Sequence, residues 1–319
     1  MKVIEHLERG QTSGAPPISF EIIPPLRGGD VKNLLTLIDD LVEFEPPFID
    51  ITSHAAEVFY EETPAGLQRR VKRKRPGTMG VCALIQNKYG IDAVPHVLCH
   101  GFTREETEDF LIELRYLGID NVLAVRGDDS GYQKPLRDGR SANRYACDLV
   151  AQIGAMNHGR YLAEDLLDAE PASFCVGVGG YPEKHFEAPN LTTDIRHLKA
   201  KVEAGASYVV TQMFFDNRHY FRFVEECRGA GITVPIVPGL KILATRNHLQ
   251  SLPRTFGAEI PEALADEVLK VDTNAQAADV GVAWAREQSA DLLAGGVPGI
   301  HFYIMSTATN VVRVIDGLR

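Results

Sequence analysis

A single carboxylate interrupts one of the most apolar stretches near the start of the chain. In the run ISFEII (18–23), Glu21 lies among apolar residues, and Pro24 and Pro25 follow, so the pattern predicts a buried strand that ends here. A buried, ionised carboxylate without a partner is costly, and its pKa usually rises until it carries a proton. Glu21 is therefore either a functional residue with a raised pKa or a structural residue paired with an Arg or Lys elsewhere in the chain.

Further polar residues stand at the ends of other apolar runs. Singly, each has a simple structural explanation: His96 and His301 could be core histidines with satisfied hydrogen bonds, and Arg126 and Asp128 could form an ion pair. Together they favour a pocket for a polar ligand, because buried polar groups need partners. The set comprises Thr52, Ser53, His54, His96, Arg126, Gly127, Asp128, Asp129, Tyr181, Glu183, His185, Gln212, Lys241, His301 and Tyr303.

The elements that must position these residues alternate along the chain. Short runs rich in Val, Ile and Phe recur, and longer stretches of helical period separate them. The predicted strands are 18–23, 48–52, 93–99, 121–127, 173–180, 207–215, 234–240 and 299–305. The ambiguous run TMGVCALI (78–85) is predicted to be helical, and Thr103 with Glu106 forms a predicted capping box.

Eight strands, each followed by a helix, indicate parallel βαβ units. A doubly wound open sheet could also hold them, but no GxGxxG motif follows any strand. We therefore predict an α/β fold, a single (β/α)₈ TIM-type barrel, whose chemistry lies at the carboxyl ends of the strands.

Composition restricts the class of protein. With 33 basic and 43 acidic residues the net charge is −10, which makes nucleic acid a poor partner. The basic run RRVKRKRPG (69–77) is interpreted as a solvated helix end or loop, with an anion-binding patch as the alternative. Five cysteines without CxxC spacing predict neither a disulfide framework nor a metal site. We find no signal peptide or membrane span, and we expect a cytoplasmic protein.

Six strings in the sequence resemble the methylenetetrahydrofolate reductases. They occur in order, at compatible spacing, between about residues 18 and 312: SFEIIPP, LAVRGD, GGYPEKHFEA, AGASYVVTQMFFD, VPIVPGL and GIHFYIM. The resemblance implies a (β/α)₈ barrel that binds FAD at its strand ends without a Rossmann turn. It also implies a single catalytic domain over residues 1–319, as in bacterial members, since the length leaves no room for the animal regulatory domain, and a homo-oligomer.

The same resemblance assigns roles to residues of this chain. Glu21 matches the general acid, and burial with Asp128 nearby as a like charge should raise its pKa to roughly 6–7. Asp128 would also lie near the pyrimidine end of the flavin, where its charge tunes hydride donation. Arg126 and Lys201 are the cations expected at the pyrophosphate. Thr52, Gln212 and Tyr303 would contact NAD(P)H or folate. The remaining FAD contacts would be Ser53, Ala55, His96, Gly127, Tyr145, Ala146, Tyr181, His185, Ala188 and Asp194.

Three positions depart from the family pattern. Ser53 stands where a Tyr is common, Thr307 replaces a frequent substrate-binding Arg, and His248 falls at a Gln position. The first concerns FAD, and the other two concern folate.

The implied reaction reduces 5,10-methylenetetrahydrofolate to 5-methyltetrahydrofolate with NADH or NADPH, by a ping-pong mechanism through FAD, and supplies methyl groups for methionine synthesis. Two alternatives remain open: another flavin barrel of the proline-dehydrogenase type, and a catalytically silent barrel subunit.

Overall fold

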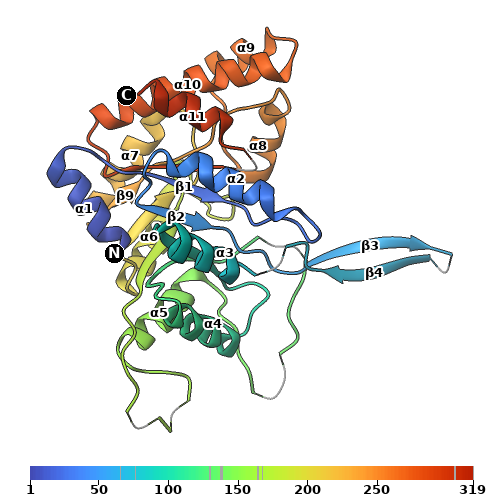
Figure 1. Ribbon diagram of the computed structural model, residues 1–319, viewed down its shortest axis with the longest axis vertical. Coiled ribbons are helices and arrows are strands. Elements are labelled where there is room, and N and C mark those ends of the chain that lie inside the picture. The colour runs from blue at the N-terminus through green and yellow to red at the C-terminus, as the bar shows by residue number, and fades with distance from the viewer. Residues whose placement is uncertain are drawn as a thin grey trace.

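The computed structural model describes residues 1–64, 66–75, 77–128, 131–136, 139–163, 165–166, 168–304 and 307–318. Its main sheet contains nine parallel strand segments in the order β10-β11-β1-β2-β5-β6-β7-β8-β9, surrounded by helices (Figure 1). The segments are β1 Ile18–Ile22, β2 Phe48–Ile51, β5 Asp92–Leu98, β6 Asn121–Val125, β7 Cys175–Gly180, β8 Tyr208–Thr211, β9 Ile236–Val237, β10 Gly239–Leu240 and β11 Ile300–Tyr303.

The sheet closes through one bent strand. β9 pairs with β8 and β10 pairs with β11, and only Pro238 separates the two segments. The carbonyl of Pro238 accepts a hydrogen bond from the His301 amide at 3.0 Å, so the chain passes from one neighbour to the other at this residue. The nine segments therefore act as eight barrel strands. The predicted fold, a (β/α)₈ barrel, is confirmed, and each predicted strand overlaps an observed one.

The helices lie outside the barrel, as βαβ connections require. Thr103 and Glu106 form the predicted capping box at the start of α4. The ambiguous run 78–85 is helical, as predicted, and leads into a π-helical turn, η1 Ile85–Tyr89. The helices are α1 Val3–Ser13, α2 Val31–Val42, α3 Met79–Leu84, α4 Arg104–Tyr116, α5 Ala146–Asn157, α6 Leu191–Glu203, α7 Asn217–Gly229, α8 His248–Phe256, α9 Glu262–Leu269, α10 Asn274–Ala294 and α11 Thr309–Asp316. None of the described helices is long and apolar enough to cross a membrane.

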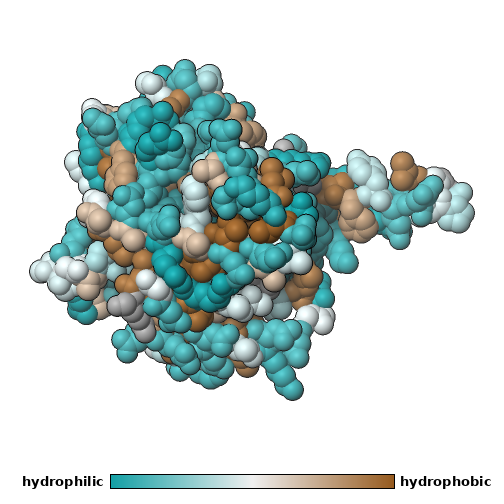
Figure 2. All heavy atoms as spheres, turned by 90° about the horizontal axis from the view of Figure 1, so that it is seen from above, coloured by the Kyte–Doolittle hydropathy of each residue, from teal (hydrophilic) through white to brown (hydrophobic). Residues whose placement is uncertain are grey.

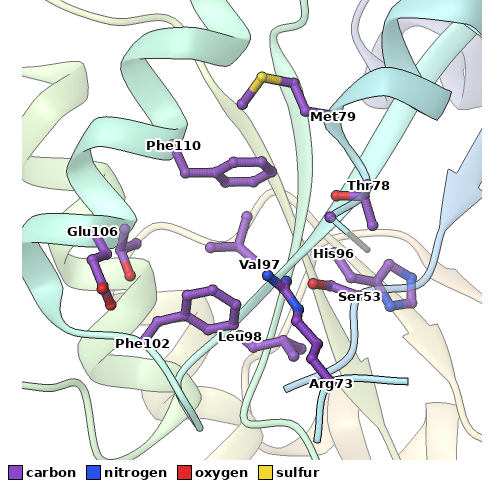
Figure 3. Close-up of a pocket in the computed structure, with 12 residues that line it drawn as sticks. Ser53, Arg73, Thr78, Met79, His96, Val97, Leu98, Phe102, Glu106 and Phe110 are labelled. Carbon is purple, nitrogen blue, oxygen red and sulfur yellow. The ribbon is translucent and has the colours of Figure 1, made fainter. Parts of the chain in front are cut away.

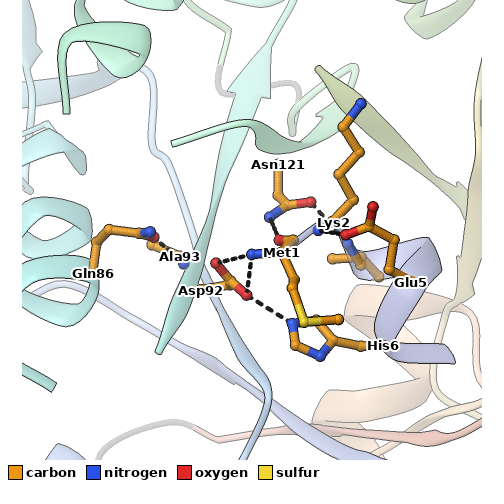
Figure 4. A network of polar contacts seen from close by, with 9 residues as sticks. Met1, Lys2, Glu5, His6, Gln86, Asp92, Ala93 and Asn121 are labelled. Atoms are coloured by element: carbon orange, nitrogen blue, oxygen red, sulfur yellow. Dashed lines mark hydrogen bonds and ion pairs between the residues drawn. The ribbon is translucent and has the colours of Figure 1, made fainter. Parts of the chain in front are cut away.

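Helix α1 closes the amino-terminal end of the barrel. Val3 and Leu7 are buried in one cluster with Phe48 and Tyr208, which come from barrel strands. Polar contacts fasten the same end (Figure 4): Asp92 accepts hydrogen bonds from the Met1 amino group at 2.9 Å and pairs with His6 at 2.7 Å. With one end plugged in this way, a ligand must enter from the carboxyl ends of the strands.

A two-stranded antiparallel arm follows β2. Strands β3 Glu57–Thr63 and β4 Gly66–Lys72 form a hairpin that projects from the barrel (Figures 1 and 2). The basic run 69–77 lies partly on β4, so its interpretation as a helix end or loop was wrong for residues 69–72, whereas residues 73–75 and 77 lie in a loop. The basic strand pairs with an acidic one: Glu57 faces Lys72, and Arg70 forms an ion pair with Glu61 at 3.0 Å. This cross-strand complementarity explains how such a charged run forms a strand.

Candidate active site

Three ionisable side chains meet inside the barrel near its carboxyl end. On β1, Glu21 lies in register with Asp50 on β2. The imidazole of His96, on β5, lies between them: its Nε2 is 3.3 Å from Glu21 Oε2 and 3.8 Å from Asp50 Oδ2. The Glu21 contact is close enough for an ion pair but is not aligned as a hydrogen bond. One nitrogen therefore faces two carboxylates.

Strand β11 and the residue after β10 complete the wall beside Glu21. His301 is fully buried, and its Nδ1 lies 2.8 Å from the Ser19 hydroxyl. Burial lowers the pKa of His301 to about 4. Lys241 donates to the Tyr303 carbonyl at 3.0 Å, and burial lowers the pKa of its ammonium to about 8. The sequence pattern placed Lys241 among the polar residues at strand ends, but we predicted no role for it.

The pKa of Glu21 differs from the one predicted. Burial alone would raise the pKa of Glu21, but attraction by His96, His301 and Lys241 outweighs burial, and the net shift is downward. The expected value of roughly 6–7 was therefore wrong. The expectation that Asp128 acts on Glu21 as a like charge was also wrong, because Asp128 is not among the groups that shift the pKa of Glu21. At neutral pH the carboxyl of Glu21 is ionised in this arrangement.

Asp50 shows the behaviour that was expected of Glu21. Its side chain is fully buried, and neither carboxylate oxygen accepts a hydrogen bond from any described residue. Burial, and then repulsion by Glu21, raises the pKa of Asp50 well above its ordinary value. The sequence analysis did not single out Asp50. The signal was nevertheless present, since the apolar run FIDI carries one carboxylate in the same way as ISFEII.

A second group of polar residues lies at the ends of β6 and β7. Arg126 forms a two-point ion pair with Glu187, at 2.6 and 2.9 Å, so the alternative of an Arg126–Asp128 pair was wrong. The ring of Tyr181 meets the ring of His185 edge-on with centroids 4.6 Å apart. Burial raises the pKa of Tyr181 to about 12, and Asp194, Arg126, Asp128 and Glu187 act on it through space.

Lys201 brings a cation into this second group. Its ammonium donates to the Gly179 carbonyl at the end of β7. Burial lowers the pKa of Lys201 to about 8, and Asp194 partly opposes the shift. Asp194 also accepts a hydrogen bond from the His185 amide at 2.8 Å. The structure therefore brings Arg126, which lies more than 50 residues earlier in the sequence, together with Tyr181, His185, Asp194 and Lys201.

A cavity of about 170 Å³ adjoins His96 and Ser53 (Figure 3). Phe102, Phe110 and other apolar side chains form most of its wall, and the guanidinium of Arg73 lies 5.5 Å from the ring centre of Phe102. Such a lining suits a flat, mainly apolar ligand group that meets a few polar atoms at one edge.

The comparisons with known proteins identify the family. The family model for methylenetetrahydrofolate reductase matches residues 5–319. The chain belongs to the methylenetetrahydrofolate reductase family. It is 30% identical to methylenetetrahydrofolate reductase 1 of Schizosaccharomyces pombe, over the whole chain and 48% of that protein. It is 29% identical to 5,10-methylenetetrahydrofolate reductase of Salmonella typhimurium, over 93% of the chain and 89% of that protein.

The chain spans about half the length of the eukaryotic members of the family that it matches, and most of the length of the bacterial ones. Among solved structures, it resembles an uncharacterized protein from Clostridium thermocellum that binds two copies of 5-methyl-5,6,7,8-tetrahydrofolic acid. The TM-score is 0.59 at 13% identity, over 98% of this chain and 97% of the other. At this identity the likeness shows the shared fold alone.

The other residues that the resemblance singled out differ in burial and in their contacts. Thr52 follows β2, and its buried hydroxyl has no hydrogen-bond partner among the described residues. Asp128 and Tyr145 are exposed, whereas Ala188 is buried. Gln212 follows β8, and its side-chain oxygen accepts from the Met213 amide at 2.9 Å. Gly127 has φ +86°, a conformation that favours glycine where the chain turns after β6. Ala55 and Ala146 are half-buried.

Two of the three departures from the family pattern, His248 and Thr307, are those that were expected to concern folate. His248 accepts a hydrogen bond from the Ala244 amide at 3.1 Å, and its pKa is lowered by burial and then by Lys241. It therefore lies on the same side as Lys241. Thr307 is exposed. The third, Ser53, lines the cavity of Figure 3.

Proposed function

We propose that this chain catalyses the flavin-dependent reduction of 5,10-methylenetetrahydrofolate to 5-methyltetrahydrofolate with NADH or NADPH. The reaction is ping-pong through FAD and supplies methyl groups for methionine synthesis. The observation that carries the proposal is the cluster of Glu21, His96 and Asp50 at the open end of a barrel that matches the family over nearly its whole length. A proton donor at that place suits a reaction in which a folate ring must open.

The residues at the strand ends fit FAD. Thr52 offers a buried hydroxyl without a hydrogen-bond partner in the described part of the chain, and Lys201 offers a buried ammonium beside β7. Arg126 and Lys201 would hold the pyrophosphate, since Arg126 follows β6 and the ammonium of Lys201, on α6, lies at the end of the neighbouring strand β7. Glu187, half exposed, now pairs with Arg126 and would give up that pairing to the pyrophosphate. When bound, the flavin accepts a hydride from the nicotinamide nucleotide and passes it to folate.

The remaining contacts would position the flavin and adjust its potential. His96, Ser53, Ala55, Tyr181 and His185 would line the FAD site. Asp128, exposed at the end of β6, would place negative charge near the ring and disfavour the anionic reduced form. Tyr145, Ala146, Ala188 and Asp194 would complete the site.

Glu21 would act on the substrate. Its proton goes to the leaving nitrogen of the five-membered folate ring as that ring opens to an iminium, which is the electrophile that accepts the hydride. Gln212 and Tyr303 would bind the folate. Reduction of the flavin by NAD(P)H needs no such proton, so the two half-reactions separate the role of Glu21 from that of the FAD site.

We also propose a single cytoplasmic catalytic domain that forms a homo-oligomer. Light scattering of the purified protein measures the oligomer. The proposed reductant is NADH or NADPH, since relatives are named for each: NADH in Arabidopsis thaliana and NADPH in Caenorhabditis elegans.

Flavin content and half-reaction kinetics test the function. The purified protein should be yellow and should release FAD on denaturation. Stopped-flow mixing should show reduction by NADH or NADPH and then reoxidation by methylenetetrahydrofolate. A folded, colourless protein would support a silent subunit, and proline-dependent dye reduction would support a proline-dehydrogenase-type enzyme. Either outcome would overturn the proposal.

A further inference from the structure

We propose that Asp50 is a positioning residue that stores the proton which Glu21 delivers to folate, with His96 as the transfer point between them. The inference rests on the proposed function and adds to it a residue that acts through Glu21. It answers a question that the site raises: how can Glu21 donate a proton if its own surroundings keep it ionised?

The two carboxyl groups differ in their exposure to solvent. The side chain of Asp50 has no exposure to solvent, whereas that of Glu21 is 16% exposed. Both oxygens of Asp50 lack hydrogen-bond partners among the described residues. An ionised carboxylate in such a place would pay the full cost of desolvation, while a protonated one is neutral. The stored proton therefore belongs on Asp50.

The charged and titratable groups around Asp50 also favour its protonated form. The titratable groups that face it are Glu21 on β1, His96 on β5, Tyr208 on β8, Tyr303 on β11 and Cys82 on α3. Burial raises the pKa of Tyr208, Tyr303 and Cys82, so these three are neutral near pH 7. Lys241 and His301 act on Glu21, and neither is among the groups that shift the pKa of Asp50. Two carboxyl groups in one confined site hold a single shared proton.

The transfer uses one atom of His96. Nε2 lies 3.8 Å from Asp50 Oδ2 and 3.3 Å from Glu21 Oε2, and neither contact is an aligned hydrogen bond at rest. When the contacts tighten, the O–H bond of Asp50 breaks as an N–H bond forms at Nε2. That N–H bond then breaks as an O–H bond forms on Glu21. Glu21 gives this proton to the leaving nitrogen, and one proton from solvent enters through Glu21 to restore Asp50.

The test compares Asp50→Asn with Glu21→Gln by stopped flow across pH. In the native enzyme the shared proton moves internally, so the folate half-reaction should change little with pH near neutrality. In Asp50→Asn only directly protonated Glu21 can act, and its lowered pKa makes that form scarcer as pH rises. The ratio of native to variant rate should therefore grow with pH, by up to about tenfold per unit, to tenfold or more near pH 8.

Reduction of the flavin by NAD(P)H in Asp50→Asn should stay within a few-fold of native. If the native enzyme shows no folate half-reaction, the proposed function has failed. If the native enzyme reacts and the ratio does not change with pH, only the role of Asp50 has failed. Glu21→Gln should instead be defective at every pH.

Infrared spectroscopy supplies a measurement that does not depend on activity. A protonated carboxyl group has a C=O stretch that an ionised one lacks, so the native protein near pH 7 should show a band that Asp50→Asn removes. Asp109→Asn, on the exposed face of α4, is the matched control and should leave the band unchanged. Should Asp50→Asn fail to fold, titration of the native band still decides, because the Asp50 band should persist well above pH 7, whereas burial raises the pKa of Glu183 only to about 7. Its absence near pH 7 would overturn the proposal.

Discussion

Glu21 and Asp50 are neighbours in register, yet their protonation differs because their surroundings differ. Glu21 is close to His96, His301 and Lys241, and these groups favour its charged form. Asp50 has Glu21 as the charge that shifts it, and it has no contact with water. The surroundings of each residue therefore favour an ionised Glu21 and a protonated Asp50.

Replacement of Glu21 by Gln removes the acid and preserves the shape. We expect Glu21→Gln to retain FAD and to be reduced by NAD(P)H within a few-fold of native. Its reoxidation by methylenetetrahydrofolate should fall by about 10²–10⁴-fold, the usual loss for a general acid. Stopped-flow measurement of both half-reactions checks this, with Glu113→Gln on the exposed side of α4 as the control. A folate half-reaction that survives within about tenfold would assign Glu21 a structural role.

Lys201 allows a prediction about stability and pH. Its pKa is about 8 in the fold and 10.5 ordinarily, so between these values the unfolded chain holds a proton that the folded chain has lost. The free energy of unfolding of the native apoprotein should therefore rise with pH in that window, relative to Lys201→Met. Urea unfolding near pH 7.5 and near pH 10 measures the difference.

The control for this comparison is Lys199→Met, because Lys199 lies on the same helix with 44% of its side chain exposed. Lys201→Met should also lose FAD more readily than the control. An equal pH dependence of unfolding in all three proteins would show that Lys201 is not buried as a cation.

At the scale of elements, the barrel closes where one strand changes partners. A methyl group on Gly239 would lie 2.1 Å from the Thr211 carbonyl oxygen and 2.7 Å from the Tyr303 ring. The Thr211 backbone and the Tyr303 ring cannot both move away from such a methyl group without opening the junction of β8, β10 and β11. The close approach explains why a glycine stands at the first position of β10.

Gly239→Ala should therefore destabilise the barrel by about 1–3 kcal/mol or more, as overpacking does. Gly229→Ala is the matched control, because no atom of the described residues lies within 4 Å of a methyl group there, and it should be neutral or slightly stabilising. Urea unfolding of the two variants compares them. Equal stabilities would mean that the junction can relax around a methyl group.

At the scale of the molecule, the two ends of the barrel have separate tasks. Helix α1 plugs the amino-terminal end with Val3 and Leu7, and the ionisable clusters lie at the other. The arm stands apart from both, with Leu67 73% exposed on β4. Stability and chemistry should therefore respond to different substitutions.

Leu7→Ala should cost about 2–5 kcal/mol, since the side chain is 1% exposed and its loss leaves a cavity under the barrel. Leu67→Ala should change stability by no more than about 0.5 kcal/mol. Both variants should keep native rates in the two half-reactions at a temperature where they remain folded. A selective loss of the folate half-reaction in Leu7→Ala would contradict this separation of the two ends.

The sequence by itself determined the barrel and many of its mouth residues. Strand and helix periods are local properties, so eight apolar runs such as ISFEII predicted eight strands without any knowledge of contacts. Parallel strands bring their carboxyl ends to one edge, which is why Glu21 and His96 could be expected to lie near one another. The capping box of Thr103 with Glu106 is equally local.

Only the tertiary structure decided which charges meet. The pKa of Glu21 is shifted opposite to expectation because His96, and then His301 and Lys241, act on its carboxyl group, and the last two are more than 200 residues away along the chain. Arg126 pairs with Glu187 rather than with Asp128 for the same reason. The arm formed because acidic and basic stretches pair across a hairpin. Electrostatic energy depends on distance through space and on burial, and a linear pattern specifies neither.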